Sequence, residues 1–361
     1  MVFKLGNFYI FFVFISAIGF MNHVISIPLI LQAAGRDAWL SVILTIVPFT
    51  FYLILLYIIA KSIYPMHFFD WCEAKVGRPL TIGIVSIFAI HFFGLSFLTF
   101  LDTVNWSIIT YLPQTPKWII ALFLACLCLY TAKSGIRTIV ILNGILLPFV
   151  LIFGFFVMSA NIPKKEASLL LPILEHGYKP VLAGMMYTIT PLFEMIVLLF
   201  LLHHLKKRVS FLSLLITGII LIYLTFGPTM GSITEFGYVE ATKQRYPAYD
   251  QWGLLSIGLF LEHVDFLSIY QWLSGATIRI SLFSFLIPEI LHLKKERTRF
   301  VTLLLLFIAM VLLVFVPISD VQFLHFLSHY YFPYAFLIVS LFTLFFTFLA
   351  LKGGEKHDVS K

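Results

Sequence analysis

The chain reads FYIFFVFISAIGFMNHVISIPLILQ over residues 8–32, and this stretch decides the fold. It is long enough to cross a bilayer, because about 20 apolar residues in a helix span the hydrocarbon core. Its middle, however, holds Gly19 and the polar residue Asn22, and Pro28 follows. Glycine lowers helix propensity, and Pro28 leaves the carbonyl of Val24 without its helical hydrogen bond. The stretch therefore predicts a membrane helix that is interrupted near the middle of the membrane.

A second stretch of the same kind reads VLAGMMYTITPLFEMIVLLFLL over residues 181–202. Pro191 lies near its middle and frees the carbonyl of Tyr187, and Glu194 follows three residues later. Backbone groups freed at this depth must be satisfied by a cavity, a ligand or a neighbouring helix. Taken alone, each interruption is also typical of a simple kink, since glycine and proline are common in membrane helices.

The composition of the whole chain is that of a membrane protein. Hydrophobic residues make up 61% of it and charged residues 11%, whereas soluble domains carry about 25% charged residues. Long apolar runs without strand-like alternation exclude a soluble multidomain protein and a membrane barrel. We expect one transmembrane domain, residues 1–351, followed by a polar cytoplasmic tail, residues 352–361. Its ten spans are predicted near residues 8–33, 38–60, 80–111, 117–131, 138–160, 181–202, 210–232, 262–291, 300–317 and 329–351.

The distribution of basic residues predicts the orientation of the chain. Most lysines and arginines fall in the segments that share a side with the N-terminus, and cytoplasmic loops are enriched in these residues. An even number of spans also returns the C-terminus to that side. Both termini are therefore expected in the cytoplasm. The net charge of +7 comes from basic residues in short loops between apolar runs, which is typical of cytoplasmic loops. Membrane lipid is therefore an expected partner, and nucleic acid is not.

The ten spans divide into two halves of five, roughly residues 1–160 and 181–351. An odd number of spans gives the halves opposite orientations, and the two interrupted stretches open them at corresponding positions. Matched interruptions in inverted halves mark a midplane binding site in transporters. The sequence thus predicts an all-α membrane fold with a central cavity between its first and sixth spans.

Ionisable residues inside the spans are the main functional candidates. Burying a carboxylate at the depth of Glu194 costs free energy, so such a residue is by default functional. Glu194 would either contact a ligand or carry a proton. The structural alternative is a protonated carboxyl group that is hydrogen-bonded to another helix. Arg279 needs a partner or must extend toward the interface, and the sequence does not name the partner. Asp102 lies about 33 Å along its helix and is expected near the outer surface as a solvated carboxylate. His91 is expected to be a packing residue.

No pattern for catalysis or for a cofactor occurs in the sequence. A glycine-rich phosphate loop, an HExxH motif and a Cys/His metal spacing are all missing. The adjacent His203 and His204 lie beside basic residues 206–208 and are expected to face anionic lipid. The chain is therefore not expected to be an enzyme, and neither a cofactor nor a metal site is predicted.

Three motifs distinguish the chain: IPLILQAAGRDAWLSVIL at residues 27–44, FGPTMGSITEFGYVEA at 226–241 and FLEHVDFLSIYQW at 260–272. Together they resemble the spore germination permeases, the B subunits of GerA-type nutrient germinant receptors. The family commonly has arginine where this chain has His263. It belongs to the amino acid–polyamine–organocation transporter superfamily. The resemblance implies an inverted five-plus-five fold like that of LeuT, with broken helices 1 and 6.

The resemblance also implies a function. The chain would act in the spore inner membrane with an A subunit and a lipoprotein C subunit, and would sense a small nutrient, most simply an amino acid, to trigger germination. By superfamily analogy the ligand lies between spans 1 and 6, against spans 3 and 8. On this chain the analogy predicts the ligand-binding residues Gly19, Phe20, Asn22, Phe97, Leu101, Thr188, Thr190, Glu194 and Ser274.

Two other functions use the same cavity. One is a coupled amino acid transporter, and the other is a passive conduit for ions or water. Some proton-coupled relatives in the superfamily have a lysine in span 5, whereas this span holds Asn143 and no lysine. That difference favours sensing over coupled transport.

Overall fold

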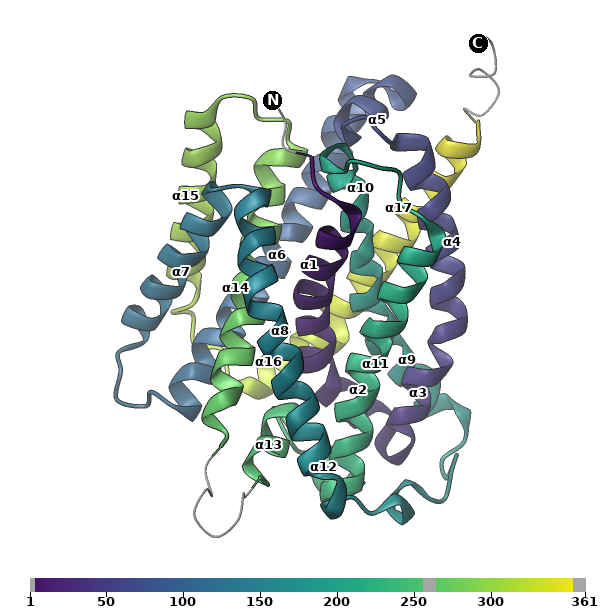
Figure 1. The fold of residues 1–361 in the computed structure, drawn as a ribbon, viewed down its shortest axis with the longest axis vertical. Helices are drawn as coiled ribbons and strands as arrows, with labels where there is room; N and C mark the ends of the chain where they lie inside the picture. Colours follow the sequence, from purple (N-terminus) through teal and green to yellow (C-terminus); the bar gives the residue numbers. More distant parts are fainter. Residues whose placement is uncertain (1–3, 256–263, 353–361) are drawn as a thin grey trace.

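The computed structural model describes residues 4–255 and 264–352, which form a bundle of helices (Figure 1). The helices before residue 161 are α1 (Asn7–Phe20), η1 (Met21–Ile25), α2 (Ser26–Ala34), η2 (Gly35–Asp37), α3 (Ala38–Leu44), α4 (Ile46–Ile63), α5 (Phe68–Val76), α6 (Arg78–Thr110), α7 (Lys117–Lys133) and α8 (Ile136–Ala160). Those that follow are η3 (Ile162–Lys164), η4 (Ala167–Leu170), α9 (Tyr178–Leu192), η5 (Phe193–Val197), α10 (Leu198–Leu201), η6 (Leu202–His204), α11 (Phe211–Phe236), α12 (Tyr238–Ala241), α13 (Pro247–Gly253), α14 (Phe266–Ile290), α15 (Glu296–Leu313), α16 (Asp320–Phe326), η7 (Leu327–Tyr331) and α17 (Phe332–Lys352).

Helices occupy the predicted membrane-spanning segments wherever the chain is described. Seven helical stretches are long and apolar enough to cross a membrane, and the first of them, Asn7–Ile63, contains two of the predicted spans. The 17 residues of α7 and the charged start of α15 keep these two helices out of that set. The all-α membrane fold is confirmed, while the number of ten spans stays a prediction. The predicted tail beyond Lys352 lies outside the described residues.

Both predicted interruptions are changes of helix type. The first span turns from α-helix to one π-helical turn at Met21–Ile25, where the Ser26 N–H bonds to the Met21 carbonyl five residues earlier. The other span leaves α-helix after Leu192 and forms a tighter 3-10 turn, Phe193–Val197, directly after Pro191. Such turns shift hydrogen bonds by one residue and are frequent at functional sites. The chain therefore stays helical through both interruptions, with altered backbone bonding at the predicted depth.

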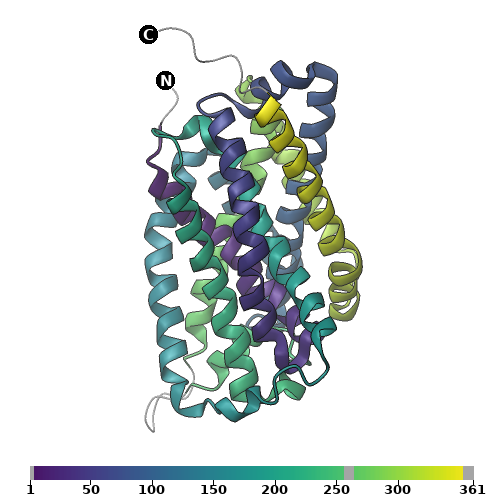
Figure 2. The same ribbon diagram turned by 90° about the vertical axis from the view of Figure 1, so that its right-hand side faces the viewer.

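The helix α14 forms the centre of the bundle. It packs against α6, α1, α8 and α7, and together with the span α9–α10 it is the most deeply buried of the apolar stretches. On the other side α9 packs against α2, α3 and α17. The chain enters α1 and leaves α17 at one end of the bundle, called here the terminal end (Figures 1 and 2). Its assignment to the cytoplasm stays a prediction.

The terminal end corrects one expectation about the two adjacent histidines. His203 and His204 do not face lipid, because both side chains turn inward to the carboxylate of Glu289. The chain after them is fixed by backbone bonds to the N-terminal segment: the Leu5 N–H donates to His204 O at 2.7 Å, and the Lys206 N–H donates to Leu5 O at 2.8 Å. This pairing holds the end of the sixth predicted span against the start of the first.

The packing of α9 makes a prediction about Gly184. A Cβ at this position would lie 2.9 Å from Ser41 Cβ and 3.0 Å from Ala34 Cβ, so neither neighbour can rotate away. We expect Gly184→Ala to lower the free energy of unfolding in detergent by about 1–3 kcal/mol, the usual cost of overpacking. Gly144→Ala is the control, since open space surrounds Gly144. An equal effect of the two substitutions would contradict the close helix contact.

Candidate functional site

A buried ion pair joins the two most buried spans at the centre of the bundle. Arg279 of α14 donates from Nη1 to Glu194 Oε2 at 2.6 Å and from Nη2 to Oε1 at 2.8 Å. Arg279 is 0% exposed and Glu194 4% exposed. The geometry is a bidentate pair between guanidinium and carboxylate, the strongest form of this contact. Each side chain is therefore the partner that the other requires at this depth.

The same guanidinium also binds two further helices. Its Nε donates to Thr99 Oγ1 of α6 at 2.9 Å, and its Nη1 donates to Ala17 O of α1 at 2.6 Å. The carbonyl of Ala17 is accessible because the Met21 N–H, its partner in a regular α-helix, bonds to Ile18 O instead. The change of helix type in the first span thus creates an acceptor for the charge in α14.

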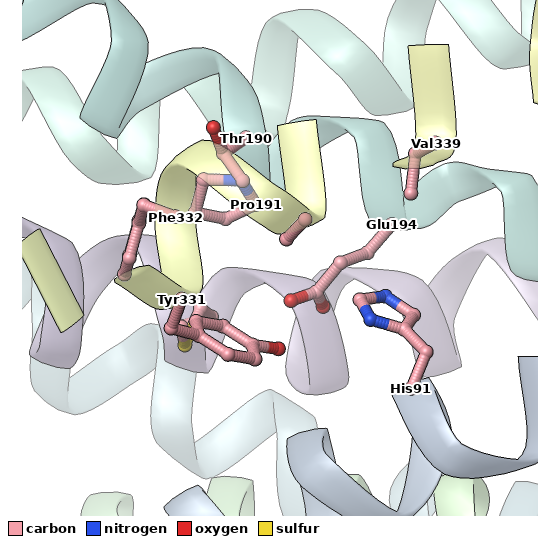
Figure 3. A pocket seen from close by; sticks show the side chains of 9 residues that line it. His91, Thr190, Pro191, Glu194, Tyr331, Phe332 and Val339 are labelled. Atoms are coloured by element: carbon pink, nitrogen blue, oxygen red, sulfur yellow. The ribbon is translucent and has the colours of Figure 1, made fainter. Parts of the chain in front are cut away.

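A small cavity lies beside this ion pair and is lined by Glu194, Thr190, His91 and Tyr331, among others. Figure 3 shows the Glu194 carboxylate between the rings of Tyr331 and His91. The cavity measures about 10 Å³, and a single water molecule needs about 10–15 Å³. In this conformation the cavity beside the sixth predicted span is therefore too small for a nutrient.

A second and much larger cavity lies on the other side of α1, bounded by α8, α11, α13 and α14. It measures about 360 Å³, which is within the usual range of about 300–1,000 Å³ for small-molecule sites. Gly19 and Phe20 line it from the first span. Its described wall contains no aspartate, glutamate, lysine or arginine.

The polar groups in the wall of the large cavity are few and mostly committed to the protein. Gln251 Nε2 donates to Pro228 O at 2.9 Å, and Gln271 Nε2 donates to Val150 O at 2.8 Å. Trp272 is different, because its indole Nε1 is buried without a hydrogen-bond partner among the described residues. Its ring is held by stacking, with 4.1 Å between ring centroids, on the ring of a second tryptophan, Trp106. Stacking therefore holds the Trp272 side chain in place in the wall of the large cavity.

The structure divides the predicted binding residues between the two cavities. Gly19 and Phe20 line the large cavity, whereas Thr190 and Glu194 line the small one. The remaining five predicted residues line neither cavity: Asn22, Phe97, Leu101, Thr188 and Ser274. The ligand-binding residues predicted from the superfamily analogy therefore do not line a single cavity in this structure.

Asn22 and Thr188 show why burial alone does not identify a binding residue. Both are 0% exposed. The Thr188 hydroxyl donates to the Gly184 carbonyl of its own helix at 3.1 Å. The two amide atoms of Asn22, in contrast, have no hydrogen-bond partner among the described residues, although its π-helical turn borders the site. Among the predicted ligand-binding residues, Asn22 thus has the least complete hydrogen bonding.

Sequence reasoning missed two polar residues that line the small cavity. His91 was expected to be a packing residue, and Tyr331 was not singled out, yet both side chains face Glu194 (Figure 3). The Tyr331 hydroxyl is buried without a partner among the described residues. Tyr331 ends a π-helical turn, Leu327–Tyr331, and Pro333 follows this turn two residues later, much as Pro28 follows the first one. That proline is the local signal that could have marked the turn.

The expectation for Asp102 was wrong. This carboxylate is 1% exposed and forms an ion pair with Arg245, and the Tyr246 hydroxyl donates to it at 3.4 Å. The reason is that the segment between α12 and α13 folds over the end of α6. Burial alone lowers the pKa of Arg245, but the Asp102 carboxylate outweighs burial and raises it. Asp102 therefore fixes this covering segment and is not solvated.

Comparison with known proteins gives two sequence matches. The sequence profile of the family described as "Spore germination protein" matches residues 6–322. The chain is also 41% identical over 332 residues to "Spore germination protein XB" of Bacillus anthracis, covering 92% of this chain and 93% of that protein. Both matches extend over nearly the whole chain.

Comparison of the structure gives a match of fold. A nucleobase-cation-symport-1 family transporter, solved in a closed conformation with bromovinylhydantoin bound, superposes with a TM-score of 0.61. The match covers 95% of this chain and 79% of that chain at 14% sequence identity. It supports the LeuT-like architecture and, at this identity, shows the fold alone.

The central ion pair makes a prediction about stability. Glu194→Gln and Arg279→Gln should each lower the free energy of unfolding in detergent by about 3–5 kcal/mol, because each leaves a buried group unpaired. The double variant should lose less than the sum of the two, since it removes both charges. Glu175→Gln is the control, because Glu175 pairs with Arg36 where the carboxylate is exposed. If Glu194→Gln costs no more than this control, the central pair is not structural.

Proposed function

The chain belongs to the spore germination protein family, and from this premise we propose that it is the nutrient-sensing subunit of a spore germinant receptor. It binds a small nutrient within the membrane and passes the signal to partner subunits. The observation that carries this proposal is the cavity of about 360 Å³ beside the altered turn of the first span. The family and the transporter-like fold support a germination or transport role, and the cavity adds a place for the ligand.

The wall of the large cavity favours a particular kind of nutrient. It presents mainly apolar side chains and aromatic rings, and its described residues include no aspartate, glutamate, lysine or arginine. A zwitterion placed there would have no opposite charge to pair with, and unpaired charges are costly away from water. The cavity therefore suits an uncharged or largely apolar nutrient better than a charged amino acid, the ligand that the resemblance most simply implied.

The position of the cavity provides a route for signalling. Gly19 and Phe20 line it two and three residues beyond Ala17, whose carbonyl holds Arg279. A nutrient bound against these residues favours one position of α1, and through Arg279 that position is linked to Glu194 in the sixth predicted span. A ligand shifts such an equilibrium only by its differential affinity for the two states.

The assembly and location follow from the same proposal. The partners are a receptor A subunit and a lipoprotein C subunit, and the protein lies in the spore inner membrane among lipid, with both termini in the cytoplasm. The terminal end, which carries His203, Glu289 and the start of α1, then faces the cytoplasm.

Two glycines of α8 provide a matched test. Gly154 lines the large cavity and Gly144 does not. A new Cβ would meet nothing within 4 Å at Gly144 and only Gln271 Nε2, at an ordinary contact distance of 3.6 Å, at Gly154. Gly154→Leu should fill the cavity and weaken nutrient binding at least about tenfold, the effect of losing about 1.4 kcal/mol. Gly144→Leu should bind as the unchanged chain does. The measurement is nutrient-dependent thermal stabilisation of the purified chain, with amino acids, sugars and nucleosides as the panel.

The germination response completes this test. Spores carrying Gly154→Leu should reach normal levels of the protein but fail to respond to the stabilising nutrient. A normal response in these spores would contradict the assignment of the nutrient to the large cavity. Transport is the second candidate because of the transporter-like fold. Accumulation of the nutrient against its gradient in liposomes containing only this chain would favour transport over sensing.

A further inference from the structure

Histidines and a carboxylate meet at the terminal end, away from both cavities. His67 precedes α5, His203 lies in η6 at the end of the sixth predicted span, and Glu289 lies one residue before the end of α14. One donor atom from each of these three residues lies within 4.8 Å of the other two. The fold has therefore gathered two imidazoles and a carboxylate from three distant segments of the chain.

The contacts converge on a single oxygen, Oε1 of Glu289. His203 Nε2 lies 2.9 Å from it, His204 Nε2 3.3 Å and His67 Nε2 4.0 Å. In a tetrahedral zinc site with bonds of about 2.0–2.1 Å, the donor atoms are about 3.3 Å apart. The observed separations lie on both sides of that value, so small side-chain movements bring the donors to coordination distance.

His204 gives an independent sign that a ligand fits here. It is 9% exposed, and its Nε2 makes no hydrogen bond to any described residue, even though it lies close to Glu289. Nδ1 of His203 is likewise buried without a partner among the described residues. Buried polar atoms are nearly always bonded. The unpaired Nε2 of His204 lies 3.3 Å from Glu289 Oε1, so a free donor atom borders this cluster.

Neighbouring groups fix the orientation of these donors. Arg299 Nη2 donates to Glu289 Oε2 at 2.6 Å, which leaves Oε1 toward the imidazoles. Nδ1 of His67 accepts a hydrogen bond from the Phe69 N–H at 3.2 Å and lies 3.3 Å from His292 Nδ1. These contacts fix the orientation of the His67 ring, as outer contacts do for metal-binding histidines.

We propose that His67, His203 and Glu289 bind a divalent cation of the zinc class, with His204 as a neighbouring fourth donor. Two or three imidazoles with one carboxylate suit Zn²⁺, Co²⁺ or Ni²⁺, whereas Mg²⁺ and Ca²⁺ prefer oxygen ligands. The bound cation ties α5 to α14 and to the end of the sixth predicted span. It thereby holds the terminal end of the bundle closed.

The test uses the full-length chain in detergent, treated with EDTA and then titrated with Co²⁺, whose visible absorption reports tetrahedral coordination. One equivalent should bind, and Zn²⁺ should raise the melting temperature while Mg²⁺ does not. His67→Gln and His203→Gln should each weaken binding at least about tenfold. The control is His325→Ala/His329→Ala, which removes an exposed histidine pair with ring centroids 4.2 Å apart. This control should bind Co²⁺ as the unchanged chain does.

The outcomes separate the proposal from its alternatives. Unchanged Co²⁺ binding in His67→Gln and His203→Gln, or its loss in the His325→Ala/His329→Ala control, overturns the site. An equal response to Mg²⁺ overturns the zinc class. The His67 and His203 side chains lie on separate segments and are 14% and 13% exposed, so each variant tests the site by itself if the other does not fold. No nutrient is present in these measurements, and their result is therefore independent of the proposed sensing function.

Discussion

A guanidinium in the middle of a membrane bundle must be neutralised where it lies, and the bidentate contact of Arg279 with Glu194 does this. Because the pair is buried, neither member can move away without leaving a charge unpaired. The guanidinium also holds Thr99 of α6 and the Ala17 carbonyl of α1. The relative positions of the first, third, sixth and eighth predicted spans therefore depend on one side chain.

This constraint explains why the irregular turns lie where they do. A regular α-helix through Met21 would use the Ala17 carbonyl for its own hydrogen bond, and Arg279 would lose an acceptor. The 3-10 turn after Pro191 in turn carries Glu194. The backbone carbonyl that the irregular turn of the first span frees is thus hydrogen-bonded by a buried arginine from another helix. This is one of the ways in which freed backbone groups are accommodated in a membrane.

The same arrangement leaves two separate spaces beside the first predicted span. The space beside Glu194 holds a water molecule at most, whereas the space beside Gly19 is large enough for a small molecule. Superfamily analogy placed the ligand between spans 1 and 6, against spans 3 and 8. In this conformation the Arg279–Glu194 pair joins spans 8 and 6, and Leu101 and Ser274 line neither cavity.

The sequence by itself determined the class of fold and the location of its irregular turns. Long apolar runs, Asn22 in the first span and Pro191 in the sixth are local features, and local features set hydropathy and backbone bonding. Only the tertiary structure decided the partner of Arg279, which lies 85 residues from Glu194 in the chain. It also decided that Asp102 is covered by Arg245, and that His67, His203 and Glu289 meet at the terminal end. These contacts join distant segments of the chain. Packing across the whole bundle sets which faces of the apolar helices meet, and the hydropathy along a single helix does not encode this packing.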